Sequence, residues 1–481
     1  MNRLLALPAV ALREKLRARE ISARELAQAT LARIDAVNPA LNAVVARNDA
    51  ATLKAADEAD ARIAAGRARP LEGLAITLKD AWEVAGLVST GGVPELKGFV
   101  PDEDAVAVAR LRAAGAVIVG KTNVPLLSGD FQSYNAIYGA TNNPWDVSTT
   151  PGGSSGGAAA AVASGMSAFE LGSDIGGSIR WPASACGVFG LKTTWDLVPT
   201  YGHVPPTRET RTQAPMQLGV AGPIGRSAAD LDLVLSIVAG PLNAAGPAHL
   251  KKPRATQAKD LRLALWIDPA APVDGRVAQA VETAAALLER DGARVDRAAR
   301  PDFSFREAFE TYSLLLNAIM VTAFPQKTRD RIAAGAQDFA PDDMSHRALQ
   351  ARAARMSAQA FEALAQKRRR IRAALADFFT RHDAILTPVT PAPAIKHDHL
   401  RDSFARVIET DRGPIPYMDM LHGAAVATLA NLPAAVAPVM RSPMPIGVQI
   451  IAAEDEDRTA IAIAGMIERA NGGFVPPPLV G

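Results

Sequence analysis

The chain has 481 residues, 48% of them hydrophobic, so it holds enough apolar material for one large core or for two fused domains. Its 52 Lys and Arg residues nearly balance 50 Asp and Glu residues, and the net charge of +2 is too small to indicate a surface that binds nucleic acid. The one cysteine, Cys186, excludes an internal disulfide and fits a reducing compartment; we interpret it as a small buried apolar side chain.

The N-terminal region shows no clear targeting signal. Its apolar run, residues 4–12, is interrupted by Pro8 and followed at once by Arg13, without a recognisable cleavage site. No apolar stretch elsewhere is long and clean enough to span a bilayer. We therefore expect a cytoplasmic protein that contacts no membrane.

The first predicted element is an amphipathic helix. Ser22 and Glu25 have the spacing of a capping box, and apolar residues follow them at helical spacing. This pattern predicts a helix over about 22–37 that ends near Asn38 and Pro39.

Helical and strand patterns then alternate along the chain. The stretch 104–114 has helical character, Gly115 breaks it, and residues 116–119 have the pattern of a short buried strand. Apolar runs typical of strands recur at 261–266, 384–386 and 446–451. The alternation predicts an α/β fold with a large mixed β-sheet covered by helices on both faces.

A stretch rich in Ala, Pro and Lys, residues 240–260, has little periodicity and predicts a surface connection. It would lead from an N-terminal catalytic portion into a helical insertion over about 260–380 that lines the substrate site. Large apolar side chains in this region could wall an acyl or aryl pocket, although core packing is the favoured role for most of them. They are Phe303, Phe305, Phe309, Tyr312, Met320 and Phe324. The basic run Lys367–Arg370 is interpreted as a solvated helix face, with a docking surface left open.

Residues 151–157 form a run with four glycines, which neither a helix nor a strand explains, because glycine loses the most backbone freedom in both. Another group is therefore expected to approach the backbone closely here. Phosphate binding is disfavoured because the run lacks the lysine of a nucleotide-binding loop. Residues 153–157 also match the nucleophile elbow of α/β-hydrolases, but the preceding stretch 146–151 is turn-like rather than a strand. Histidines further along the chain keep the elbow interpretation open.

A second loop, residues 172–180, carries sharper information. In its segment 174–178, consecutive backbone N–H groups before a serine could converge on one point, as the oxyanion of an acyl transfer requires. Ser178 is therefore the candidate nucleophile. Asp174 and Arg180 flank it, and we interpret them as an ion pair that braces the turn.

Lys79 follows a strand-like run, residues 74–78, where a lysine alone is usually a solvated charge. Together with Ser154 and Ser178 it completes a set of Lys, Ser and Ser that can open an amide bond. A lysine acts as a base only when it is neutral, which requires burial among apolar neighbours. We therefore expect a site closed to bulk water, with Asp80 pointing away from Lys79.

These motifs, with residues 430–434 and 445–449, are similar to the amidase signature family of Ser-Ser-Lys amide hydrolases. The likeness covers most of the chain, and the spacings 154 − 79 = 75 and 178 − 154 = 24 agree with that family. The resemblance implies a single catalytic domain over 1–481. Ser178 would be the acylated nucleophile, Ser154 a bridging serine whose peptide bond is usually cis, and Lys79 the base.

The resemblance also implies an oxyanion hole and a supporting shell. The backbone N–H groups of the hole would be those of Ile175, Gly176, Gly177 and Ser178. Ser155 would support the network through hydrogen bonds, beside the expected ion pair of Asp174 and Arg180.

The implied activity is that of an amidohydrolase. It would cleave a carboxylic amide, foremost a linear one, or a related carbamate or cyclic amide, through a serine acyl-enzyme. We expect a small-molecule amide substrate, no nucleic acid, no cofactor and no metal ion, and a homodimer is left open. His397 and His399 have some metal-ligand character but lack evident third and fourth ligands.

Two other functions stay open. One is the glutamine-hydrolysing subunit of glutamyl-tRNA(Gln) amidotransferase, which belongs to the same family and releases ammonia from glutamine. This chain departs from that amidotransferase component at Trp181, where the latter typically has Gln, and at Leu126, within a stretch that replaces an acidic pattern. The other is a non-catalytic scaffold of the same fold, against which the retention of Lys79, Ser154 and Ser178 argues.

Overall fold

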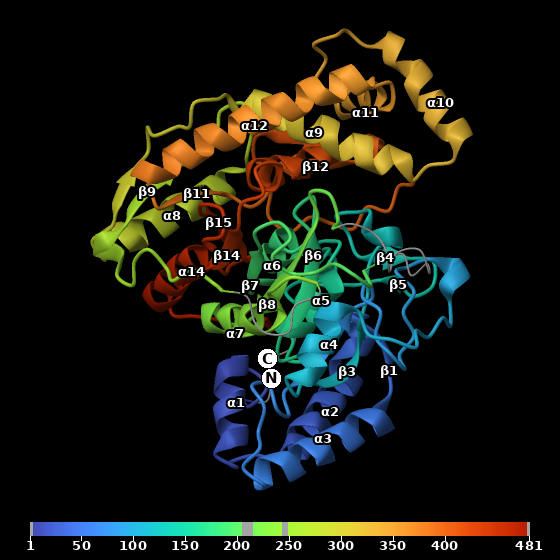
Figure 1. Cartoon of the computed structure of the whole chain (residues 1–481), viewed down its shortest axis with the longest axis vertical. Coiled ribbons are helices and arrows are strands. Elements are labelled where there is room, and N and C mark those ends of the chain that lie inside the picture. Colours follow the sequence, from blue (N-terminus) through green and yellow to red (C-terminus); the bar gives the residue numbers. More distant parts are fainter. Residues whose placement is uncertain (1–2, 204–214, 243–248, 479–481) are drawn as a thin grey trace.

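Two β-sheets lie side by side in the computed structural model, which describes residues 3–203, 215–242 and 249–478 (Figure 1). Within these ranges the larger sheet has eight strands in the order β10-β9-β11-β15-β14-β7-β8-β6. It is mixed, because β9 pairs in parallel with β10 and β11 while the other pairs are antiparallel. In that order the strands are Arg294–Asp296, Arg262–Leu265, Ala384–Pro388, Ile446–Ile451, Ala434–Met440, Phe189–Lys192, Val220–Gly225 and Glu170–Asp174.

The smaller sheet has the order β1-β3-β2, with β3 antiparallel to β1 and parallel to β2. Its strands are β1 Val44–Arg47, β3 Val117–Thr122 and β2 Ala75–Lys79. Two separate short ladders pair β4 with β5 and β12 with β13; these strands are Tyr134–Asn135, Gly139–Ala140, Val407–Thr410 and Gly413–Pro416.

Helices cover both faces of the larger sheet, as the sequence predicts. On β11, Ala384 and Leu386 enter the core that includes α8 and α14, whereas Ile385 between them enters the core beneath α9 and α12. The alternation is that of a strand with apolar packing on both sides. The helices are α1 Ala9–Arg17, α2 Ala23–Leu41, α3 Asp49–Ala64, α4 Val106–Ala113, α5 Gly156–Ala163, α6 Arg180–Cys186, α7 Ala228–Val238, α8 Gly275–Arg290, α9 Phe305–Thr322, α10 Gln326–Ala334, α11 His346–Ala354, α12 Ala358–Arg381, α13 Ala425–Leu429 and α14 Asp457–Asn471.

Side-chain and loop contacts join the two sheets along their neighbouring edge strands, β2 and β6. The N–H of Ala168 donates to the carbonyl of Ala75 (2.9 Å), and the N–H of Thr77 donates to Ser167 Oγ (2.8 Å). The ends of β2 and β6 therefore lie close together. Lys79 is the last residue of β2, so this junction positions it beside the loop that follows β6.

The predicted elements correspond to observed ones with one clear error. The capping box of Ser22 and Glu25 is present, and the strands expected near 117, 262, 384 and 446 are β3, β9, β11 and β15. The predicted end of α2 at Asn38-Pro39 is wrong, because the helix continues to Leu41. Pro39 removes one backbone donor but lies in the last turn, and Asn38 Oδ1 holds the next turn by accepting the N–H groups of residues 43 and 44.

Gly115 ends the helix α4 as predicted, and the structure gives the reason. Its φ is +101°, and an added Cβ would lie 2.8 Å from the backbone of Glu72. Only glycine fits this turn without displacing the neighbouring segment. Cys186 is buried in α6, as expected, and burial raises the pKa of its thiol.

The region expected to form an insertion, about 260–380, contains α8 to α12 and also β9 and β10, which belong to the larger sheet. Figure 1 shows α9, α11 and α12 together at one end of the molecule. Residues 243–248 of the expected surface connection lie outside the described ranges. Among the described residues, no helix has the length and apolar character needed to cross a membrane.

The basic run Lys367–Arg370 is part of α12 and makes specific contacts. Arg368 is directed inward and donates to the carbonyl of Leu429 and to Asn431 Oδ1, while the other three cations each face a glutamate. The run therefore helps to attach α12, in addition to forming a solvated face.

Candidate active site

Lys79 is completely buried at the end of β2. Its Nζ lies 2.7 Å from Ser154 Oγ and 2.9 Å from Ser173 Oγ. Burial lowers the pKa of Lys79 to about 7, although the nearby carboxylates of Asp174 and Glu170 act in the opposite direction. A substantial fraction of this lysine is therefore neutral near pH 7.

Carboxylates near Lys79 are held by other donors. Asp80 points away, as predicted: it lies 3.2 Å from Lys121 Nζ and accepts hydrogen bonds from the backbone and hydroxyl of Thr90. Glu170 accepts the backbone N–H of Lys79 together with two threonine hydroxyls, and burial raises its pKa to about 7. The Nζ atom thus faces hydroxyl groups, with no hydrogen-bonded carboxylate among the described residues.

Ser154 stands in the glycine-rich loop, and the Gly153–Ser154 peptide bond is cis. An added Cβ on Gly153 would lie 2.6 Å from the backbone of Phe131 and Gln132. The close approach that the glycine run predicts is therefore an approach of the protein's own 130–132 segment. No strand precedes Ser154 between residue 141 and residue 153, so the nucleophile-elbow alternative lacks its structural context.

Ser155 ties this loop to the second one. Its N–H donates to the carbonyl of Ser178 (3.1 Å), and its hydroxyl lies 3.4 Å from both the N and the O of Ser173. Through these contacts Ser155 connects the Ser154 loop to the Ser178 loop, which agrees with the hydrogen-bonding role expected for it.

Asp174 organises the loop that carries Ser178. Its carboxylate accepts the N–H groups of Gly177 (3.0 Å) and Ile179 (3.1 Å) and pairs with the Arg180 guanidinium at 2.7 Å. Burial alone would raise the pKa of Asp174, but the Arg180 pair and these donors lower it to about 2. The predicted ion pair is present, and the carboxylate is ionised at any ordinary pH.

The same contact changes the expected oxyanion hole. Because the Gly177 N–H is bonded to Asp174, it is not free to bind an oxyanion in this conformation. The N–H groups of Ile175, Gly176 and Ser178 have no hydrogen-bond partner among the described residues. Of the four expected donors, three therefore have no hydrogen-bond partner among the described residues, and their role in an oxyanion hole stays a prediction.

Ser178 is almost fully buried, with 7% of its surface exposed. The hydrogen bonds of the described residues join Lys79 to Ser154, but none joins the hydroxyls of Ser154 and Ser178. The loops that carry Ser154 and Ser178 are instead linked by the hydrogen bond from the Ser155 N–H to the Ser178 carbonyl.

Tyr312, on α9, reaches the same loop; from the sequence it was expected only as one of the side chains that could wall an apolar pocket. Its hydroxyl donates to the carbonyl of Ile175 at 2.9 Å. An added Cβ on Gly176 would lie 3.1 Å from Leu421 Cδ2 and 3.7 Å from both Phe131 and Tyr312. Apolar and aromatic side chains therefore surround the middle of the loop. Of the other large apolar residues expected here, Phe309 is buried, Phe303 and Phe305 are partly buried, and Met320 and Phe324 are exposed.

His203 was not expected at the site from the sequence. Its Nε2 lies 2.8 Å from Ser173 Oγ, and its ring packs edge-on against Trp82 with centroids 4.6 Å apart. Burial, with a further contribution from the Lys79 charge, lowers the pKa of His203 to about 3. No periodicity or motif marks this histidine in the sequence, whereas Ser173 lies within the loop motif itself.

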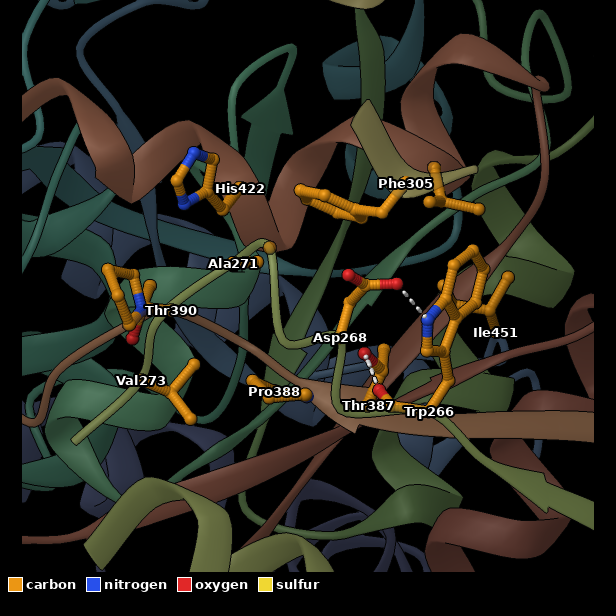
Figure 2. A pocket seen from close by; sticks show the side chains of 13 residues that line it. Trp266, Asp268, Ala271, Val273, Phe305, Thr387, Pro388, Thr390, His422 and Ile451 are labelled. Carbon is orange, nitrogen blue, oxygen red and sulfur yellow. Dashed lines mark hydrogen bonds between the residues drawn. The ribbon is translucent and has the colours of Figure 1, made fainter. Parts of the chain in front are cut away.

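Figure 2 shows a separate hollow, lined by Trp266, Asp268, Phe305 and His422 among others. Its polar groups are partly engaged, since Trp266 Nε1 donates to Asp268 and Thr387 Oγ1 donates to the Trp266 carbonyl. It encloses about 40 Å³, the room of one or two water molecules. No member of the Lys-Ser-Ser set lines it, so we do not assign the amide substrate to it.

The two histidines with metal-ligand character lie in ring contacts. His397 and His399 pack edge-on against each other, and His399 stacks on Tyr134. Within the described ranges, no group of three or more His, Cys, Asp or Glu side chains could hold a metal ion.

Comparison with known proteins agrees with this architecture. The chain is 34% identical to an indoleacetamide hydrolase of Bradyrhizobium diazoefficiens, over 95% of this chain and 85% of the relative. It is 32% identical to a glutamyl-tRNA(Gln) amidotransferase subunit of Carboxydothermus hydrogenoformans, over 95% of both chains. The structure of 6-aminohexanoate cyclic dimer hydrolase complexed with substrate superposes with a TM-score of 0.78 and 28% identity, over 99% of this chain and all of the other. The sequence profile described as Amidase matches residues 25–461, and the chain therefore belongs to the amidase family.

Proposed function

We propose that this protein is a serine amidohydrolase in which Ser178 attacks the amide carbonyl, Ser154 relays the proton and Lys79 is the base. The observation that carries the proposal is the buried Lys79 amine, whose Nζ contacts Ser154 Oγ at 2.7 Å and whose pKa is lowered to about 7 by burial. A lysine in this state can accept a proton near neutral pH, which an ordinary lysine cannot.

In the first half-reaction, a bond forms between Ser178 Oγ and the carbonyl carbon. The Ser178 proton moves to Ser154 as the Ser154 proton moves to Lys79, and the carbonyl oxygen becomes an oxyanion. The free N–H groups of Ile175, Gly176 and Ser178 support its stabilisation. When the C–N bond breaks, Ser154 protonates the leaving nitrogen and regains a proton from Lys79, so the amine departs neutral. Water then hydrolyses the acyl-serine by the same relay.

The substrate class that we propose is a small amide with an apolar or aromatic acyl group. Leu421, Phe131 and Tyr312 surround Gly176 at the centre of the proposed oxyanion loop. Two charged pairs lie near this loop, Asp174–Arg180 within it and Asp130–Arg406 next to Phe131, and in each pair the two charges are matched at 2.7 Å. The names of the indoleacetamide hydrolase and the cyclic dimer hydrolase are consistent with this class.

The second candidate is the glutamine-hydrolysing component of an amidotransferase, because that enzyme's name recurs among the sequence relatives. Glutamine carries an ammonium and a carboxylate that need charged partners in a binding site. Trp181, which departs from the amidotransferase pattern, is buried and donates through Nε1 to the carbonyl of Phe131, whose ring lies beside Gly176. We therefore favour hydrolysis without partner chains.

A fluorophosphonate labelling experiment tests the proposal. Intact protein should be labelled at Ser178, identified by peptide mapping, and Ser178→Ala should not be labelled there. A panel of aryl, alkyl, cyclic and carbamate amides, together with glutamine, then defines the substrate. Label at another serine, or turnover that survives in Ser178→Ala, would refute the mechanism. Fast ammonia release from glutamine alone would establish the second candidate.

A further inference from the structure

The hydrogen bonds around Lys79 extend one step further than the proposed relay requires. Ser173 Oγ lies 2.9 Å from Lys79 Nζ and 2.8 Å from His203 Nε2, and these two are its hydrogen-bond partners among the described residues. A serine hydroxyl has one proton to give and two lone pairs to receive. The direction of the two bonds is therefore linked, because Ser173 can donate to only one of its neighbours.

The direction of the two Ser173 hydrogen bonds decides whether the lone pair of neutral Lys79 is available to Ser154. A neutral amine has two N–H groups and one lone pair. If Lys79 donates to Ser173, its lone pair stays available for the Ser154 proton, and the Ser173 proton must go to His203 Nε2. If His203 instead donates to Ser173, Lys79 is the remaining acceptor for the Ser173 proton among these partners, and Ser173 then competes with Ser154 for the lone pair.

The surroundings of His203 favour the first arrangement. The ring is packed against Trp82 in a position where burial and the Lys79 charge hold its pKa near 3, so it is neutral at working pH. When Lys79 is protonated it can only donate, so Ser173 accepts from it, and His203 Nε2 is the acceptor that the described residues offer for the Ser173 proton. The ring proton of His203 is then on Nδ1, which is buried and has no hydrogen-bond partner among the described residues.

The other titratable and charged groups near Lys79 do not replace His203 Nε2 as the acceptor of the Ser173 proton. They are Glu170 and Asp174 on β6, and Lys121 on β3 with its partner Asp80. The Glu170 oxygens accept from two threonine hydroxyls and two backbone N–H groups. The Asp174 oxygens are occupied by Arg180 and by backbone N–H groups of its own loop.

We propose that His203 is a positioning residue of the relay: it accepts the Ser173 proton at Nε2 and so reserves the Lys79 lone pair for Ser154. The inference rests on the proposed function, since it assumes that Lys79 is the base. His203 itself touches neither the substrate nor the reacting atoms. Its effect is transmitted through the orientation of a single hydroxyl group.

His203→Phe is the first test, because it keeps a ring against Trp82 and removes the acceptor. We expect kcat to fall about 10- to 100-fold, as it does when a side chain that orients a metal ligand is removed, with KM little changed. The Ser173 proton would then turn to the neutral amine and stabilise it. The acidic limb of the pH–kcat/KM profile should therefore move to lower pH although the enzyme is slower.

His203→Gln restores an acceptor oxygen and should recover most of the lost rate and the wild-type position of the limb. Within a Ser173→Ala background, His203→Phe should add little, because the linking hydroxyl is already missing. His382→Phe serves as the matched control. That histidine also packs against an aromatic ring, Phe378, but lies at the C-terminal end of α12, so its variant should keep wild-type kinetics.

Wild-type kcat and an unmoved limb in His203→Phe would overturn the inference. A rate loss with an unmoved limb that Gln does not repair would do so too, because it would indicate a purely structural role. If His203→Phe does not fold, His203→Asn decides the matter by the same two readouts, since its shorter side chain ends before Ser173. Ser178→Ala, measured in parallel, separates the two levels: if it is inactive, a negative His203 result refutes only this inference, and if it is active, the proposed function fails and the inference fails with it.

Discussion

Lys79 is expected to destabilise the folded protein at neutral pH, and the size of this effect can be worked out. Burial lowers its pKa from 10.5 to about 7, despite the opposing influence of Asp174 and Glu170. The difference, 10.5 − 7 = 3.5, corresponds to roughly 5 kcal/mol at about 1.4 kcal/mol per pKa unit. The lysine is thus one of the costliest side chains to bury, which is expected of a base that must release its proton.

The sign of the pH dependence follows from proton binding. Below pH 7 the lysine is charged in the folded and unfolded states, and the full cost is present. Between pH 7 and 10.5 the unfolded chain holds a proton that the folded chain has released, so stability rises with pH through this window. Replacing the lysine by methionine keeps an unbranched side chain that is one heavy atom shorter, and it removes the titration.

Lys79→Met should therefore have a larger free energy of unfolding than wild type at pH 7. This difference between the two proteins, the stability gap, should shrink by roughly 2–3 kcal/mol at pH 9. Urea unfolding of both proteins at the two pH values measures the gap, and the subtraction cancels groups that titrate in both. Lys192→Met is the matched control. Burial lowers the pKa of Lys192 to about 7 as well, but its Nζ donates to the carbonyls of Thr193 and Leu432, so this variant should show the same stability trend and retain turnover.

A gap that is the same at pH 7 and pH 9 would show that Lys79 keeps its proton in the fold, and the argument for a neutral base would collapse. Turnover should be lost in Lys79→Met in spite of its greater stability. Lys79→Arg distinguishes a base from a fixed charge, because a guanidinium does not deprotonate in this range. Substantial activity in the arginine variant would contradict the relay.

Three further variants probe the loop after β6. Ser178→Ala should abolish turnover while the unfolding midpoint stays close to wild type, because only the nucleophilic oxygen is removed; hydrolysis of a verified substrate by this variant would exclude Ser178. Gly177→Ala has room for its Cβ, whose nearest neighbour would be Ala424 at 3.8 Å, but its φ of +102° is strained for alanine, so steady-state kinetics should show kcat about 100-fold lower through misplaced neighbouring N–H groups. Tyr312→Phe loses the hydrogen bond to Ile175, worth about 1 kcal/mol or roughly fivefold in rate; an unchanged kcat would show that α9 does not hold the loop.

The fold could be anticipated because its signals are local. Alternating apolar runs and helical stretches predict a sheet with helices on both faces, and a turn such as Gly115 reports its own backbone conformation. The exception, the end of α2, depended on Asn38, whose side chain holds the turn beyond Pro39. A local rule for proline cannot foresee such a compensation.

The site could be anticipated in part, because Lys79 and Ser154 stand in motifs with fixed spacing. The contacts that modify it come from elsewhere. Tyr312 reaches the loop from α9, and His203 belongs to a segment without regular structure; neither residue has a sequence pattern that reveals its partner. The sequence also shows which backbone N–H groups lie near Ser178, but not which acceptors they bind. In the structure, the N–H of Gly177 donates to the carboxylate of Asp174.

Because the candidate site lies at the junction of β2 and β6, activity should depend on the relative position of the two sheets. Lys79 ends a strand of the smaller sheet, whereas Ser173 and Ser178 belong to the edge strand of the larger sheet and to its following loop. Glu170 fastens this junction by accepting donors from both β2 and β3. A local opening that separated the edges by an ångström or two would leave helices and strands intact and yet break the contact between Lys79 and Ser154, on which the proposed relay depends. In a denaturant series, the protein should therefore lose its hydrolytic activity at a lower denaturant concentration than that at which circular dichroism records any loss of structure.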